Sequence, residues 1–303
     1  MNQSAIRNPH SAIESSHQGR PILAMLAAAL LWSTSGLLVK VIAIDAIPLA
    51  GWRSAIAGVT LWLIARALHV RIGIPADATS WLAVICYGAI LFLFIAATKI
   101  TAAANVIFLQ YTAPIYVLVF EPVFLGTRFR LRDLLFVSLA LLGMSLFFVG
   151  RMESGDWRGN AMALASGMAF AAFALLVRRR HDDDAARWQA VVWGNLVLFG
   201  LTLLFLLLDP APTMFPASLQ ESLGVLFLGV IQIGLAYAFF SYAISHLSAL
   251  EATLIAMLEP VLNPVWVYLG MGEEPSRWAI LGGALIIGAV SWRTVMELRR
   301  QNL

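Results

Sequence analysis

The sequence predicts an all-α polytopic membrane protein with ten transmembrane helices. Three observations predict this class: ten long apolar stretches, a hydrophobic content of 60% and a charged content of only 12%. About 20 apolar residues in a helix cross the roughly 30 Å hydrocarbon core of a bilayer. The strands of a membrane β-barrel alternate in polarity and are about half as long, so that class is excluded. The ten stretches are residues 22–39, 48–65, 81–98, 103–125, 132–149, 160–177, 188–208, 222–243, 249–270 and 278–295.

The residues before the first stretch are of a different kind. Residues 1–20 are polar, Ser-rich and without periodicity, so we expect a disordered tail at the cytoplasmic membrane surface. Nine further stretches follow the first one, which indicates a retained helix and not a cleaved secretory signal. Residues 297–303 form a second cytoplasmic tail. The single cysteine, Cys86, excludes an internal disulfide.

The distribution of positive charge predicts the orientation of the chain. Of the 20 Lys and Arg residues, 14 lie in the two tails and in the alternate loops on the same side. Positive residues resist translocation, so this richer side faces the cytoplasm. We therefore expect a multi-pass protein of the bacterial inner membrane with both termini in the cytoplasm. The loops on the opposite side contain five: Lys40, Lys99, Arg151, Arg158 and Arg277.

The chain contains an internal repeat. The segment MLAAALLWSTSGLLVK at 25–40 aligns without gaps with ALASGMAFAAFALLVR at 163–178. A second correspondence aligns Pro114 with Pro260. Its offset along the chain differs from that of the first alignment by eight residues, and a difference in loop length between the two halves can account for this. A rival register, which aligns the Glu-Pro-Val beginning at Glu121 with the one ending at Val261, stays open.

The repeat divides the chain into two halves of five helices, residues 21–152 and residues 153–296. Because five is an odd number, the two halves must insert with opposite orientations. Inverted repeats of this kind place a substrate site between them near the middle of the membrane. The sequence therefore predicts two inverted five-helix repeats with a central site.

Small residues recur in two of the stretches. In a membrane helix such residues let a neighbouring backbone approach closely. The same residues could mark a dimer face, but we expect a functional monomer because the pathway should lie inside one bundle. They are Gly159, Ala163, Gly167 and Ala171 in the sixth stretch, and Gly282, Gly283 and Gly288 in the tenth.

Three segments of the chain resemble a known family. The first helix has Trp32-Ser33-Thr34-Ser35 followed by Lys40, Arg53 lies early in the second, and residues 258–290 have a Pro, Gly-Glu and Gly-rich closing pattern. This combination is similar to the drug/metabolite transporter superfamily, in its ten-helix EamA-type permeases. The resemblance implies a secondary transporter of small metabolites. Within the family the overall character is most similar to the bacterial exporters of aromatic amino acids.

Glu259 is the strongest site candidate, because it lies halfway along the ninth stretch. A charged side chain at that depth costs about 2.5 kcal/mol or more unless it is protonated, paired or hydrated. Asn263 follows on the same helical face, and Pro260 and Pro264 predict a bend with free carbonyl groups. Two interpretations stay open: a site for a substrate amine or a proton, or a hydrogen bond between helices that holds the bend.

Five other polar residues have weaker signals. Gln110 and neighbouring Tyr111 lie deep in the fourth stretch, whereas Glu121 lies near its cytoplasmic end and is expected to reach the interface. Arg53 is expected to be structural or to extend its side chain to the interface. Lys40 ends the first helix, where it could attract a substrate carboxylate or equally reach the interface.

Aromatic side chains deep in the stretches complete the predicted site. Apolar walls with a few polar groups suit an aromatic or aliphatic solute of modest size. The substrate-binding candidates are Trp32, Ser33, Lys40, Tyr87, Gln110, Tyr111, Trp193, Gln232, Tyr237, Glu259 and Asn263.

The sequence also excludes several functions. It has no phosphate-binding loop for a nucleotide and no metal-ligand spacing, so we expect no cofactor, no enzymatic activity and no nucleic-acid partner. A nucleotide-sugar site would need several cations within the membrane, and only Arg53 lies inside a stretch. We expect export of amino acids, aromatic or otherwise apolar, by alternating access without ATP, either downhill or coupled to protons. The alternative is a multidrug, nucleobase or other metabolite carrier of the same fold.

Overall fold

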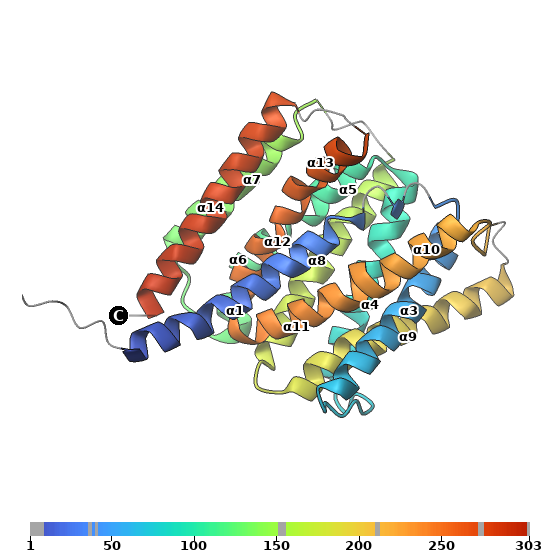
Figure 1. Cartoon of the computed structure of the whole chain (residues 1–303), viewed down its shortest axis with the longest axis horizontal. Helices are drawn as coiled ribbons and strands as arrows, with labels where there is room; N and C mark the ends of the chain where they lie inside the picture. Colours follow the sequence, from blue (N-terminus) through green and yellow to red (C-terminus); the bar gives the residue numbers. More distant parts are fainter. Residues whose placement is uncertain are drawn as a thin grey trace, which may run out of the picture.

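The computed structural model describes residues 9–35, 38–39, 42–150, 156–209, 213–271 and 276–301, and every regular element in these ranges is a helix (Figure 1). The elements are α1 (Pro9–Trp32), α3 (Ala46–Ala67), α4 (Ala78–Ile100), α5 (Ala103–Gln110), α6 (Ala113–Leu125), α7 (Leu131–Phe147), α8 (Trp157–Arg179), α9 (Asp184–Leu208), α10 (Leu219–Phe227), the π-helix η1 (Leu228–Leu235), α11 (Ala236–His246), α12 (Ala249–Ala256), α13 (Leu258–Met271) and α14 (Arg277–Gln301).

Each of the ten predicted apolar stretches overlaps one of these helices or a consecutive series of them. Seven spans in the described chain are long and apolar enough to cross a membrane. The first, fifth and ninth stretches contain shorter helices, so the count of ten membrane spans stays a prediction. The chain is a multi-pass membrane protein.

The N-terminal region differs from the expectation of a disordered tail. The helix α1 begins at Pro9, so the described part of residues 1–20 is helical. Proline is well suited to the start of a helix, because its missing N–H has no intrahelical partner there and its φ is already helical.

Two of the apolar stretches are interrupted near their middle. The helix α5 ends at Gln110, four residues before Pro114, and α12 ends at Ala256, four residues before Pro260. In a continuous helix each proline would have to donate to the carbonyl of that last residue, and it has no N–H to donate. The sequence predicted a bend in the ninth stretch, and the structure has a break there and a second one in the fourth.

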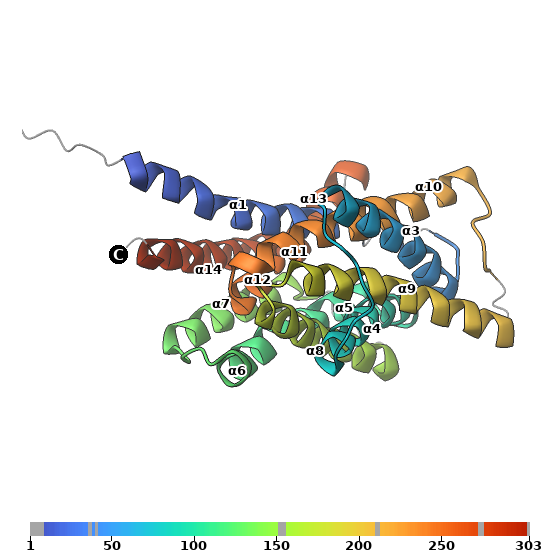
Figure 2. The same ribbon diagram turned by 90° about the horizontal axis from the view of Figure 1, so that it is seen from below.

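The helices pack in a layered bundle around α4, α8, α1 and α11. The helix α8 contacts α4, α5 and α6, and α1 contacts α11, α12 and α13. The helices α3 and α9 pack on each other on one side, and α7 and α14 lie side by side at the opposite edge (Figures 1 and 2).

Small residues allow the closest of these helix contacts. A Cβ atom on Gly167 of α8 would lie 2.6 Å from the carbonyl oxygen of Gln110, and one on Gly159 would lie 2.7 Å from Thr101 Cβ. A Cβ on Gly143 of α7 would lie 2.8 Å from the carbonyl oxygen of Gly282 in α14. The predicted close approach is therefore confirmed for Gly159 and Gly167 of α8. It is also confirmed for Gly283, whose Cβ would lie 3.0 Å from Val261 Cγ1. It is wrong for Gly288, whose Cβ would meet nothing within 4 Å.

Candidate functional site

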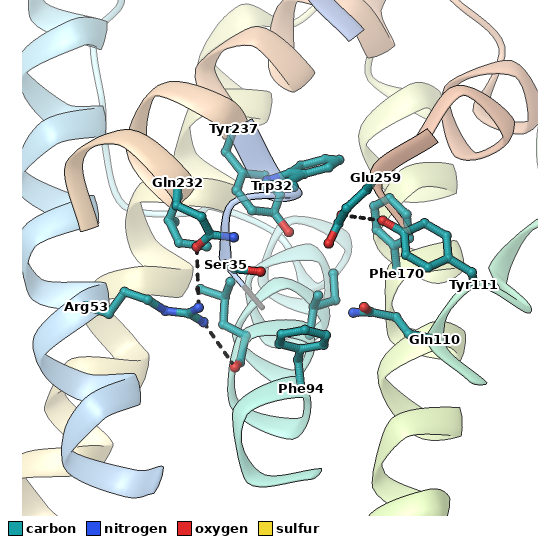
Figure 3. Close-up of a pocket in the computed structure, with 13 residues that line it drawn as sticks. Trp32, Ser35, Arg53, Phe94, Gln110, Tyr111, Phe170, Gln232, Tyr237 and Glu259 are labelled. Atoms are coloured by element: carbon teal, nitrogen blue, oxygen red, sulfur yellow. Dashed lines mark hydrogen bonds between the residues drawn. The ribbon is translucent and has the colours of Figure 1, made fainter. Parts of the chain in front are cut away.

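A cavity lies between the helices in the middle of the bundle (Figure 3). Its volume is about 50 Å³, counted as the space open to the centres of water molecules. This conformation has room for a few water molecules, since each needs roughly 10–15 Å³ on that measure. A larger solute requires the walls to move apart. The lining residues are Trp32, Ser35, Arg53, Ile90, Leu91, Phe94, Gln110, Tyr111, Phe170, Gln232, Ile233, Tyr237 and Glu259.

Arg53 is the one cation in this lining, and it is only 1% exposed. Its Nη1 donates to Gln232 Oε1 at 3.5 Å and its Nη2 donates to the Leu91 carbonyl at 3.4 Å, both long for hydrogen bonds. Its buried Nε has no partner among the described residues. No acidic side chain of the described chain forms an ion pair with it. The expectation that Arg53 reaches the interface is wrong, because α3 turns this side chain into the bundle.

Glu259 is the one acid in the lining, and it lies on the opposite side of the cavity from Arg53 (Figure 3). It is the second residue of α13, directly after the break in the ninth stretch. Its carboxylate accepts a hydrogen bond from the phenol of Tyr111, which lies in the break of the fourth stretch, directly after the end of α5. Polar side chains from the two breaks thus form a hydrogen bond across the bundle. The hydrogen bond from Tyr111 agrees with the interpretation that Glu259 links two helices. The position of Glu259 in the cavity lining also agrees with the interpretation that it binds a substrate amine or a proton.

Aromatic rings form much of the remaining wall. The ring of Trp32 lies 5.0 Å from that of Tyr237 and 6.1 Å from that of Phe170, measured between centroids. The indole Nε1 of Trp32 is buried and has no partner among the described residues. These rings offer an apolar surface with an indole N–H donor at its edge.

A further polar side chain of the lining, that of Gln110, comes from α5. The amide of Gln110 donates to Ser166 Oγ of α8 at 3.0 Å, and Ser166 in turn donates to the Ile90 carbonyl at 3.3 Å. This chain of hydrogen bonds ties α5, α8 and α4 together beside the cavity.

Six of the predicted substrate-binding residues line the cavity. They are Trp32, Gln110, Tyr111, Gln232, Tyr237 and Glu259.

Three other predicted residues lie elsewhere. Ser33 accepts from Trp266 Nε1 at 2.8 Å, outside the lining. Tyr87 is fully buried behind Tyr237, with ring centroids 4.6 Å apart. Trp193 lies away from the cavity, where its indole donates to the Gly73 carbonyl at 2.7 Å.

The last two predicted residues cannot be placed in the site. Lys40 lies outside the described residues, and Asn263 belongs to α13 but its side chain is not described.

Sequence reasoning missed Arg53 and Phe170 as members of the cavity. Phe170 aligns with Trp32 in the repeat of 25–40 and 163–178, and that correspondence was a signal that could have found it. Ser35 belongs to the Trp32–Ser35 cluster that resembles the family, and that cluster was a signal that could have found it. Phe94 and the aliphatic lining residues have no signal in the sequence, because apolar side chains of this kind occur on every face of every stretch.

Glu121 belongs to a separate polar cluster outside the central cavity. It is 7% exposed, and its carboxylate accepts from the backbone N–H groups of Ala249 and Leu250 at 3.2 and 3.3 Å. The expectation that Glu121 reaches the interface is wrong, since it is buried and satisfies the first N–H groups of α12. Beside it, Arg293 of α14 pairs with Asp133 of α7 at 3.1 Å.

Two stretches of the chain, residues 19–149 and 157–294, match the model of the EamA-like transporter family. The chain belongs to this family. It is 30% identical to the uncharacterized transporter YwfM of Bacillus subtilis over 274 residues, which cover 88% of this chain and 90% of that protein. It is 26% identical to a probable terminal-alkyne amino-acid exporter of Streptantibioticus cattleyicolor over 182 residues, 59% of each chain.

One solved crystal structure shows the same fold as this EamA-like chain. The TM-score is 0.80 at 20% sequence identity, and the superposition covers 92% of this chain and 98% of that one. At this identity the likeness concerns the fold alone.

Proposed function

We propose that this transporter exports amino acids, aromatic or otherwise apolar, across the bacterial inner membrane by alternating access without ATP. The observation that carries the proposal is Arg53, a buried guanidinium that faces the cavity without an acidic partner among the described residues. A buried charge without a partner is costly, and a substrate carboxylate would relieve that cost.

The opposite wall supplies the complementary charge. An amino acid carries a carboxylate and an ammonium group, and Arg53 and Glu259 face each other across the cavity (Figure 3). A carboxylate of the substrate would bind Arg53, and its ammonium group would bind Glu259, which Tyr111 holds in place. Trp32 and Tyr237 would then contact an apolar side chain. One cation and one acid suit a zwitterion better than a multiply charged anion.

The packing of the helices supports two inverted repeats. If α1 corresponds to α8 and α4 to α11, the contact of α1 with α11 has its counterpart in the contact of α8 with α4. The breaks correspond as well. The last residues of α5 and α12, Gln110 and Ala256, are 146 residues apart, and Pro114 and Pro260 have the same separation. This favours the Pro114–Pro260 register over its rival.

The cavity lies between the proposed halves, as alternating access requires. We propose that both termini face the cytoplasm, that one copy is functional, and that the outward direction reflects either the cytoplasmic excess of substrate or antiported protons. The relative from Streptantibioticus cattleyicolor, named a probable terminal-alkyne amino-acid exporter, agrees with this substrate class.

Transport by the purified protein in liposomes tests the proposal. Labelled phenylalanine, tryptophan or methionine should enter down a gradient without ATP, and unlabelled substrate inside should accelerate entry if empty carriers reorient slowly. Liposomes that move none of these amino acids but carry hydrophobic cations or nucleobases would contradict the amino-acid assignment and favour a multidrug or other metabolite carrier.

A further inference from the structure

A neutral amide, that of Gln232, lies beside the buried guanidinium of Arg53, although buried charges are usually paired with an opposite charge. Gln232 is 5% exposed, and its Oε1 accepts from Arg53 Nη1 at 3.5 Å. Its amide nitrogen points toward the middle of the cavity (Figure 3). Gln232 therefore touches the guanidinium without neutralising it and still has N–H groups to offer.

The π-helix η1 positions this amide. A π-helix has a wider turn than an α-helix, and such segments occur frequently at functional sites. Two glycines bring η1 close to α3: a Cβ on Gly229 would lie 2.5 Å from Ile56 Cβ and 3.0 Å from the Arg53 carbonyl, and one on Gly234 would lie 2.7 Å from Thr60 Cγ2. This close approach places Gln232 next to the side chain of Arg53.

The choice of an amide over an acid at this position has a chemical consequence. Glutamine and glutamate have nearly the same size, but a glutamate would form an ion pair with Arg53 inside the protein. That internal ion pair would compete with a carboxylate from a solute, whereas an amide leaves the full positive charge available. The amide N–H can also donate to a carboxylate held by Arg53.

We propose that Gln232 is a specificity-determining residue, which makes a carboxylate group a requirement for transport. The inference rests on the proposed function, because it assumes that the cavity takes amino acids. An acid at this position would reverse the requirement, and the cavity would then prefer an amine of the same shape without the carboxylate.

The test compares uptake of labelled phenylalanine and labelled phenethylamine by proteoliposomes containing the wild-type protein, Gln232→Glu or Gln232→Met. A matched control is Gln220→Glu, the same substitution at an exposed position of α10 outside the cavity. Wild type and control should prefer phenylalanine. Gln232→Glu should lose about tenfold to a hundredfold of the phenylalanine uptake, the usual effect of one hydrogen bond to a charged group, and should gain uptake of the amine.

Gln232→Met separates specificity from packing, since it retains the size of the side chain without adding charge. It should keep the preference for phenylalanine at a reduced rate. If Gln232→Glu keeps the wild-type preference, or if both variants lose phenylalanine uptake and neither gains the amine, the specificity assignment is overturned. If the wild-type protein takes up neither compound, the proposed function itself fails and the assignment falls with it.

Discussion

The polar side chains of the cavity differ in how well the protein satisfies them. Glu259 has a strong donor in Tyr111, whereas Arg53 has two long contacts and one N–H without a partner among the described residues. Burying such groups is unfavourable for folding, so their retention in a cavity fits a role in binding. The two residues should therefore respond differently to substitution.

Replacing Glu259 by glutamine should weaken binding of an amino acid about tenfold to a hundredfold, because a charge-assisted hydrogen bond to the ammonium group is lost. Wild-type binding should also weaken at acid pH, where a protonated carboxyl no longer attracts that group, and the variant should lose this pH dependence. Titration of the purified protein with labelled phenylalanine at several pH values measures both effects. Glu121→Gln is the matched control, since Glu121 also precedes a proline but lies outside the cavity; an unchanged pH dependence in Glu259→Gln would assign Glu259 a structural role.

The types of residue in the apolar stretches predicted part of this site. The residues that the sequence missed depend on whether a side chain points into the bundle or away from it. Glu259 and Tyr111 could be singled out because their polar groups lie deep in apolar stretches. Arg53 was expected to be structural or to extend to the interface, because its distance from the end of its stretch permits both directions, and the choice depends on how α3 packs. Trp193 fits the same sequence pattern as Trp32, yet only the packing of α9 shows that it lies away from the cavity.

At the scale of helices, proline, glycine and capping groups set the geometry of the site. The sequence predicts that Pro260 and Pro264 bend the ninth stretch, and the structure places a break four residues before Pro260. A second break, which was not predicted, lies four residues before Pro114. The π-helix η1 was not predictable, since its sequence is as apolar and regular as that of its neighbours. Its position follows from the contact with α3.

The close approach of η1 and α3 predicts that Gly229→Ala destabilises the protein. The new Cβ would lie 2.5 Å from Ile56 Cβ, and the forced separation should cost about 1–3 kcal/mol. Gly200→Ala in α9 is the control, because its Cβ meets nothing within 4 Å, and it should stabilise its helix by about 0.5–1 kcal/mol. Thermal denaturation of the two variants in detergent measures the difference. Equal melting temperatures would contradict the close contact.

Glu121 connects α6 to the first turn of α12, so Glu121→Ala should lower the stability of that junction. The substitution leaves the backbone N–H groups of Ala249 and Leu250 without their acceptor, at a cost of about 1–3 kcal/mol for each buried group. Glu121→Gln keeps one acceptor oxygen and should be less harmful. The same denaturation assay ranks the variants, and an alanine variant as stable as the wild type would show that the cap contributes nothing.

At the scale of the whole molecule, the proposed inverted halves predict which loops face each side. In a Cys86→Ser background, single cysteines at the exposed positions Asp156 and Phe215 should react with an impermeant thiol reagent added to intact cells. Cysteines at Arg71 and Asp182, which are also exposed in the structure, should react only after the membrane is opened. Reaction of Asp156 and Asp182 variants from the same side would contradict the proposed topology.

The overall helical architecture was largely predictable, because long apolar runs leave few alternatives in a membrane. The sequence alone could not order the contacts between helices, since the stretches are chemically similar on most faces. The pairing of α1 with α11 and of α4 with α8, which places the cavity at the centre, is a property of the packed bundle.

The most direct test of the central claim is the binding of labelled phenylalanine to the purified Arg53→Gln variant. Arg66→Gln is the control on the same helix, because Arg66 is exposed and lies over the ring of Trp62 outside the cavity. Wild type and Arg66→Gln should bind with the same affinity. Arg53→Gln should bind about tenfold to a hundredfold more weakly, because the charge-assisted contact to the carboxylate is lost. Wild-type affinity in Arg53→Gln would contradict the claim that this cavity recognises an amino acid through its carboxylate.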